Sequence, residues 1–176
     1  MLIKKKSFKR PINRVVIILI GAFFLFGCEP AVKQRGLPID VPITLDKGGE
    51  TVDFEFYITE DYFYSFGLKY FFDKENPGDV DGLLELIESH GIRRQVLVEV
   101  DVMIWAVADS KLSVIYKNTV PVIKTLSGGN GDYFKEIVEL RLRPGVYRLR
   151  VENKIAREQF YNRKIAVAIE RSYKGK

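Results

Sequence analysis

Two acidic residues on one strand are the first candidates for chemistry in this sequence. Glu99 and Asp101 are two residues apart in a stretch of alternating apolar and polar residues. By strand geometry their carboxyl groups share one face, about 7 Å apart. A glycosidase can use a carboxylate pair at such a separation. Acidic residues also alternate on ordinary solvated strand faces, and we expect no catalysis from this pair.

Other residue types that catalyse reactions are scarce. The chain has one histidine, His90, and one cysteine, Cys28, so a typical zinc site or a serine-histidine-acid triad cannot be assembled. His90 ends a helical pattern, where an imidazole is a common feature. Asp79 and Asp81 could begin a calcium loop, but leucines follow where oxygen ligands are required. We expect no enzyme, no metal and no cofactor.

The cysteine follows an apolar segment near the beginning of the sequence. Residues 1–14 contain six basic residues and no acid, and residues 15–26 contain no charge. A transmembrane helix needs about 20 apolar residues, which is more than this segment provides. A basic region followed by a short apolar region indicates a cleaved export signal.

The boundary Leu25-Phe26-Gly27-Cys28 resembles the lipobox of bacterial lipoproteins. The resemblance implies cleavage after residue 27, a lipid on the Cys28 sulfur and acylation of the new amino terminus. Residues 1–27 are then a signal peptide, and residues 28–38 are the lipidated cysteine and a tether. Two or three acyl chains hold a protein firmly to a bilayer. Glu29, where inner-membrane lipoproteins tend to carry aspartate, implies an outer-membrane anchor facing the periplasm.

The positive charge of the chain belongs to its leader. Residues 1–27 carry six of the 28 basic residues and no acid, so 22 basic and 23 acidic residues remain, a net charge of −1. A nearly neutral domain lacks the basic surface that nucleic acids require. With Cys28 acylated, no thiol remains for a disulfide, so we expect an apolar core to hold the domain.

Residues 39–173 alternate apolar and polar positions in the manner of an antiparallel sandwich. Predicted strands cover residues 39–45, 52–58, 62–72, 95–107, 137–143, 147–152 and 164–171, with one or two more within 112–124. Pro42 predicts an edge strand or a bulge, because proline cannot donate to a strand ladder. Leucines at helical spacing after a polar turn predict one short inserted helix at about 79–89, with Asp79 at its N-cap.

The segment Leu142-Arg-Pro-Gly-Val-Tyr147 resembles the tyrosine corner of immunoglobulin-like sandwiches. The resemblance implies that the tyrosine hydroxyl bonds back to the turn and that the two flanking strands lie in opposite sheets. A simple hairpin with a Pro-Gly turn is the alternative. We expect an immunoglobulin-like β-sandwich of about seven to nine strands, similar to small proteobacterial envelope lipoproteins with one such domain of unknown function.

Two sets of side chains are candidates for binding. Glu99, Asp101 and Trp105 share the face of their strand that points away from the core, a composition found in interaction patches. The alternative, which we favour, buries Leu97, Met103 and Trp105 beneath the predicted helix. A second set, divided between two strands, comprises Arg141, Arg143, Arg148 and Arg150. A tyrosine corner would place these two strands in opposite sheets, and we expect the set to be split.

The sequence therefore predicts a lipid-anchored, non-catalytic protein-binding module of the cell envelope. Its partners are the membrane, through the lipid on Cys28, and a protein of unknown identity, which for an immunity protein would be a toxin. The alternative is a structural or assembly accessory of an envelope or secretion complex.

Overall fold

The computed structural model describes residues 36–88 and 96–173, apart from the side chains of residues 124–127. The predicted signal peptide, Cys28 and His90 lie outside the described residues. Within those residues, no helix is long and apolar enough to cross a membrane.

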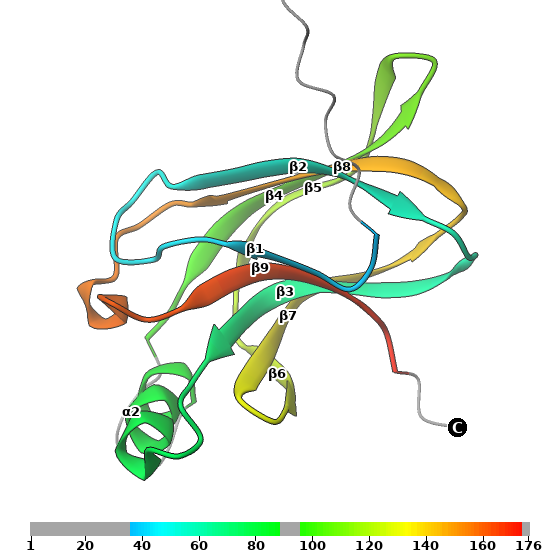
Figure 1. Ribbon diagram of the computed structural model, residues 1–176. Coiled ribbons are helices and arrows are strands. Elements are labelled where there is room, and N and C mark those ends of the chain that lie inside the picture. Colours follow the sequence, from blue (N-terminus) through cyan, green and yellow to red (C-terminus); the bar gives the residue numbers. More distant parts are fainter. Residues whose placement is uncertain (1–35, 89–95, 174–176) are drawn as a thin grey trace, which may run out of the picture. The chain divides into compact units, whose positions relative to one another are not determined.

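Within residues 36–88 and 96–173, nine strands form two antiparallel sheets, which confirms the predicted β-sandwich (Figure 1). The five-stranded sheet has the order β1 (Ile39–Pro42), β9 (Ile165–Arg171), β3 (Tyr62–Phe71), β7 (Asp132–Leu142) and β6 (Lys124–Gly128). The four-stranded sheet has the order β2 (Thr51–Ile58), β8 (Gly145–Asn153), β4 (Glu99–Ala108) and β5 (Lys111–Pro121). The strand containing Pro42 lies at the edge of its sheet, as predicted.

The arrangement matches an immunoglobulin-like sandwich in six strands and departs from it at the last one. The ladders β3-β7-β6 and β8-β4-β5 correspond to the B-E-D and F-C-C′ groups of that fold. The last strand, β9, should then pair with β8. Instead β9 pairs with β3 in the other sheet, and β2 takes the place beside β8.

The core is formed by alternate side chains of the strands. Along β2 every second side chain is buried, and β4 and β8 bury the matching positions that face the opposite sheet. The ring of Phe56 stacks on Tyr147 with centroids 5.6 Å apart, and it meets the edge of Phe66 from the other sheet at 5.8 Å. These aromatic contacts join the two sheets.

The inserted helix α2 (Pro77–Ile87) lies beyond the end of β3, two residues earlier than predicted (Figure 1). It begins with a proline in its first turn, and Asn76 rather than Asp79 holds the N-cap position. Asp79 instead accepts a hydrogen bond from the backbone amide of Asp73 and forms an ion pair with Arg163. The predicted cap was wrong because Pro77 favours the first helical position, which starts the helix earlier.

A buried lysine from β7 holds the other end of this helix. Lys135 is 2% exposed, and its ammonium group donates to the carbonyl oxygen of Ile87 and, at 3.4 Å, to that of Ile123. Burial lowers the pKa of Lys135. A cation is stabilised by the partial negative charge at a helix C-terminus. This contact, together with buried Leu83 and Ile87, fixes α2 against the end of the sandwich.

The tyrosine corner is present. The Tyr147 hydroxyl donates to the carbonyl oxygen of Arg143 at 2.8 Å, and the two flanking strands, β7 and β8, lie in different sheets. The hydrogen bond closes the turn on which the chain passes between sheets. Because the Tyr147 ring also stacks in the core, one side chain stabilises both the turn and the interior.

Replacement of Tyr147 by Phe should lower the free energy of unfolding by about 1 kcal/mol, since it removes one hydrogen bond and keeps the ring. Urea denaturation of the two proteins measures the difference. The matched control is Tyr57→Phe, because the Tyr57 side chain is exposed on a strand face. Equal stability of the Tyr147→Phe and control variants would show that the hydroxyl does not support the corner.

Candidate functional site

The candidate residues on β4 lie together on the outer face of the four-stranded sheet. Val100, Val102 and Ile104 point into the core, so the side chains that alternate with them, including Glu99, Asp101 and Trp105, point outward. Trp105 is partly exposed. The predicted common face is therefore present.

The inserted helix does not cover this face, so that prediction was wrong. Leu97 is 43% exposed, and Met103 and Trp105 are partly exposed. The apolar residues of α2, Leu83 and Ile87, instead join the core of the sandwich. The helix remains at the end of β3 because its buried residues and Lys135 attach it there.

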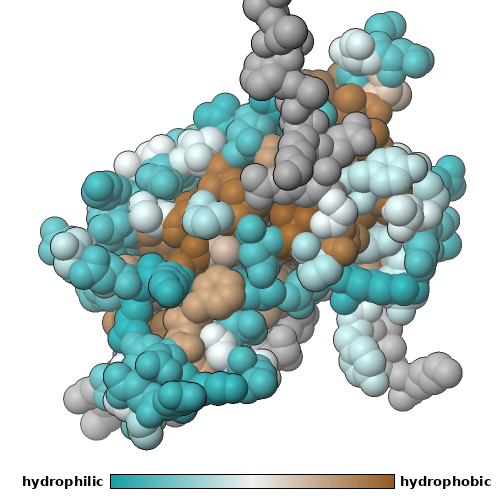
Figure 2. Space-filling model, in the orientation of Figure 1, coloured by the Kyte–Doolittle hydropathy of each residue, from teal (hydrophilic) through white to brown (hydrophobic). Residues whose placement is uncertain are grey.

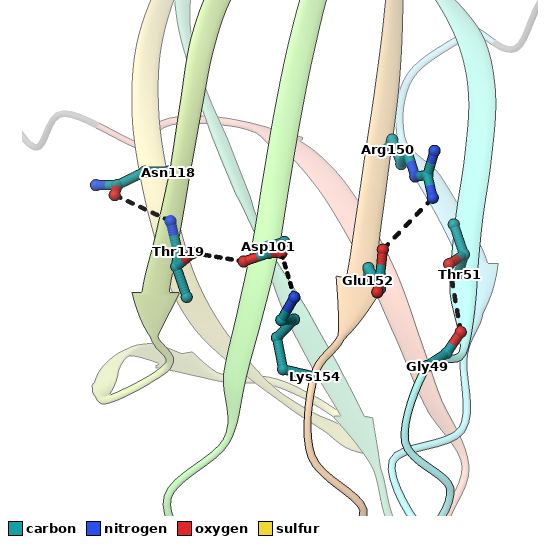
Figure 3. Close-up of polar contacts among 8 residues, drawn as sticks. All are labelled: Gly49, Thr51, Asp101, Asn118, Thr119, Arg150, Glu152 and Lys154. Carbon is teal, nitrogen blue, oxygen red and sulfur yellow. Dashed lines mark hydrogen bonds and ion pairs between the residues drawn. The ribbon is translucent and has the colours of Figure 1, made fainter.

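One half of the face is a network of ion pairs and hydrogen bonds (Figure 3). Asp101 accepts a hydrogen bond from the Thr119 hydroxyl of β5 and forms an ion pair with Lys154 at 2.8 Å. In the same half, Arg150 contacts Glu152 at 3.4 Å. The hydrogen bonds from Lys154 and Thr119 lower the pKa of Asp101. Asp101 is thus held ionised at neutral pH, which does not suit a general acid.

The other half of the face is apolar. Tyr57, Val146, Val107 and Leu112 occupy neighbouring positions on the four strands and form one row across the sheet. The next row contains Trp105 beside Val114. Three of these side chains are well exposed: Tyr57 at 43%, Leu112 at 47% and Val114 at 58%. We call Tyr57, Val107, Leu112, Val114 and Val146 the apolar patch.

The four arginines do not form a common surface, as expected from the tyrosine corner. Arg141 lies on β7 of the five-stranded sheet and pairs with Asp61 at 2.8 Å. Arg148 lies on β8 of the other sheet, and its two hydrogen bonds to Asp53 measure 2.7 and 2.9 Å. These hydrogen bonds raise the pKa of Arg148. Arg150 is also on β8, and Arg143 is exposed at the corner.

Polar groups buried on the five-stranded sheet were not found from the sequence. Lys69 lies between Asp40, at 3.0 Å, and Glu170, at 2.6 Å. Burial lowers the pKa of Lys69, but its hydrogen bonds to Glu170 and Asp40 outweigh this effect and raise the pKa overall. Ser65 donates to Glu136 at 2.8 Å and lies 2.7 Å from the Ser172 hydroxyl. The only signal was a serine and a lysine within an aromatic strand.

A hollow of about 420 Å³ lies at the edge of the same sheet. Its lining includes the apolar residues Pro42, Phe71 and Ala166 and the charged residues Asp40, Glu50, Arg163 and Lys164. Of these charges, Asp40 is paired with Lys69, and Arg163 is paired with Asp79. The outer face of the four-stranded sheet offers more exposed apolar surface, and we take that face as the candidate site.

Fold and surface together define a small antiparallel β-sandwich with one sheet face that is half charged and half apolar. Residues 38–171 match the family described as Domain of unknown function (DUF5625), and the chain belongs to that family. The description of the family assigns no activity.

Solved structures support the fold alone. The crystal structure of a protein from Sulfurospirillum deleyianum is similar, with a TM-score of 0.61 and 23% identity over 77% of this chain and 97% of that one. A structure of infectious bursal disease virus, Gt strain, has a TM-score of 0.28 and 15% identity over 75% of this chain and 30% of that one. The second score is too low to indicate a shared fold. No curated protein matches the sequence.

Replacement of Lys154 by Gln should raise the pKa of Asp101, because the hydrogen bond from Lys154 is the largest cause of its lowering. A carboxylate whose pKa is lowered on folding stabilises the fold above its unfolded pKa, and this contribution is lost as the pH falls through the folded pKa. The variant should therefore lose less stability on acidification than the parent. Carboxyl-carbon NMR titration measures the pKa.

Lys117→Gln is the matched control, since Lys117 contributes the smallest of the causes that lower the pKa of Asp101. The rise in the control should be the smaller of the two. An unchanged Asp101 pKa in Lys154→Gln would mean that the ion pair shown in Figure 3 does not form in solution.

Proposed function

We propose that this protein is a lipoprotein of the bacterial cell envelope whose sandwich domain binds a protein partner and catalyses no reaction. The lipobox-like boundary at Cys28 supports the anchor. The first strand begins at Ile39, so the predicted tether of residues 28–38 precedes the sandwich. This order of leader, cysteine, tether and compact domain suits a protein held at a membrane by lipid alone.

Charge and the residue after the cysteine support the proposed location. Without residues 1–27 the chain has a net charge of −1, which offers nucleic acids little attraction. Glu29 takes the place of the aspartate that tends to retain lipoproteins in the inner membrane. We therefore assign the anchor to the outer membrane, with the domain in the periplasm.

The observation that carries the binding proposal is the mixed face of the four-stranded sheet. Trp105 lies where the apolar patch meets the half that contains Glu99 and Asp101. Energetically dominant interface residues are often tryptophans ringed by polar groups. Contacts with Lys154 and with the Thr119 hydroxyl orient the Asp101 carboxylate on this surface. We assign partner binding to the half of the face from Trp105 to Glu99.

Two partner classes fit a small anchored binding module. The first is a toxin, which an immunity protein would sequester in the periplasm. The second is a component of an envelope or secretion complex, for which the domain would be an assembly accessory. A toxin gene beside the coding gene would favour the first, and a cluster of secretion or pilus genes would favour the second.

The Trp105→Ala variant should bind its partner from envelope extracts about tenfold less tightly than the parent protein, because Trp105 lies at the border of the proposed partner surface. Affinity capture with mass spectrometry identifies the partner, and titration with the purified partner gives the ratio. Tyr161→Ala is the control, because Tyr161 is 68% exposed outside this face. Capture of no partner, together with hydrolase activity on envelope substrates, would contradict the proposal.

Intact mass of the purified protein should show a chain that begins at Cys28 and carries acyl groups. The Cys28→Ala variant should keep residues 1–27, because the modified cysteine is required for cleavage in lipoproteins. A full-length chain with an unmodified Cys28 would show that the lipid-anchor proposal is wrong.

A further inference from the structure

The apolar patch lies at the end of the sandwich where the chain enters the domain. Leu37 and Pro38 line a hollow together with Thr59, which follows β2 directly. Tyr57 of the apolar patch is two residues before Thr59. The patch and the attachment point of the tether therefore belong to the same end of the molecule.

A projecting hairpin extends the patch at this end. The β4–β5 hairpin turns at Asp109 and Ser110, which both have positive φ angles, and it stands out from the sandwich in Figure 1. In Figure 2 its tip is polar, and the surface where it joins the sheet is apolar. Leu112 and Val114 lie on this hairpin. An exposed apolar area on a sheet face marks a contact with protein or membrane.

The length of the predicted tether indicates that the apolar patch contacts the membrane. Eight residues separate Cys28 from Leu37, and a chain of this length spans about 15–18 Å on average as a random coil and about 30 Å when fully extended. Strand β4 has ten residues and is about 33 Å long. A lipid on Cys28 would therefore hold the patch end near the bilayer, while the opposite end of the sheet lies beyond the average reach of the tether.

We infer that the apolar patch is a second membrane-binding site, which rests on the lipid surface and orients the domain. The inference rests on the proposed lipid anchor. Because the tether keeps the bilayer at a high effective concentration, a patch with weak intrinsic affinity docks. Trp105 then lies at the membrane boundary, where amphipathic aromatic rings are favoured. Glu99 and Asp101, further along β4, remain available to a partner in the periplasm.

Charged side chains of both signs lie near the apolar patch, so the contact with lipid is mainly apolar. Lys111 and Arg143 are exposed at this end, and so is Asp109 at the hairpin tip. Glu55 and Arg148 share the row of Trp105, next to the patch. Since basic and acidic side chains are both present, attraction to anionic lipid is weak. Docking should persist in vesicles of phosphatidylethanolamine and phosphatidylcholine without anionic lipid.

Trp105 provides the test, because it is the only tryptophan in the chain. The purified, acylated protein that begins at Cys28 is reconstituted into vesicles. The lipids of these vesicles carry bromine near the top of the acyl chains, and bromine quenches tryptophan fluorescence on contact. The docked domain should show strong quenching. Leu112→Asp and Val114→Asp should each weaken docking about tenfold or more, because each removes a buried apolar side chain from the contact.

Ile155→Asp is the matched control. Ile155 is 45% exposed, close to the value for Leu112, but it follows β8 at the opposite end of the sheet. Its variant should keep the quenching of the parent. Far-ultraviolet circular dichroism checks that all three variants remain folded.

Three results would overturn the inference. Acylated protein that floats with the vesicles but shows no quenching would contradict membrane docking and leave the lipid anchor intact. If the Trp105 fluorescence shows a side chain shielded from water that brominated lipid does not quench, and cross-linked dimers form, then a second copy of the chain covers the patch. Protein with an unmodified Cys28 that fails to float would overturn both the anchor and the docking site.

Discussion

The stacking of Phe56 between Tyr147 and Phe66 is the contact on which the sandwich most depends. It joins the two sheets in a chain whose single cysteine cannot form an internal disulfide. Tyr147 also fixes the corner through its hydroxyl. At this corner the chain passes from β7 in one sheet to β8 in the other. The corner therefore sets which side chains of β8 face outward and lie beside Trp105 on the candidate face.

The outer face of the four-stranded sheet has two halves that suit different contacts. The half near Asp101 is charged and internally paired, whereas the half near Tyr57 is apolar and exposed. A short tether at the apolar end would turn that half toward the bilayer and the charged half toward the periplasm. In this account the anchor does more than localise the protein, because it presents the partner surface in a preferred orientation.

Local patterns in the sequence predicted the elements that depend on neighbouring residues. Alternation identified β2, β4 and β8, Pro42 indicated an edge strand, and the spacing from Leu142 to Tyr147 predicted the corner and the split arginines. The position of α2 could not be predicted in this way. It depends on Lys135, which lies far from the helix in sequence and reaches the Ile87 carbonyl only in the folded chain.

Strand pairing also could not be predicted from local sequence patterns. The alternation in β9 is compatible with either sheet, and its pairing with β3 depends on residues far away in the sequence: Ile165 lies opposite Tyr70, and Ile169 lies opposite Phe66. The apolar patch was likewise hidden, because its members come from four strands and become neighbours only through the register of the sheet. Trp105 was visible in the sequence, but the row beside it was not.

Hydroxyl-radical footprinting of intact envelopes measures most directly whether the apolar half of the face is covered where the protein works. Tyr57 and Trp105 should be protected in envelopes and labelled in a lipid-free soluble fragment that begins after Cys28, while Tyr161 is labelled equally in both. Equal labelling of Tyr57 in envelopes and in the soluble fragment would contradict a covered face.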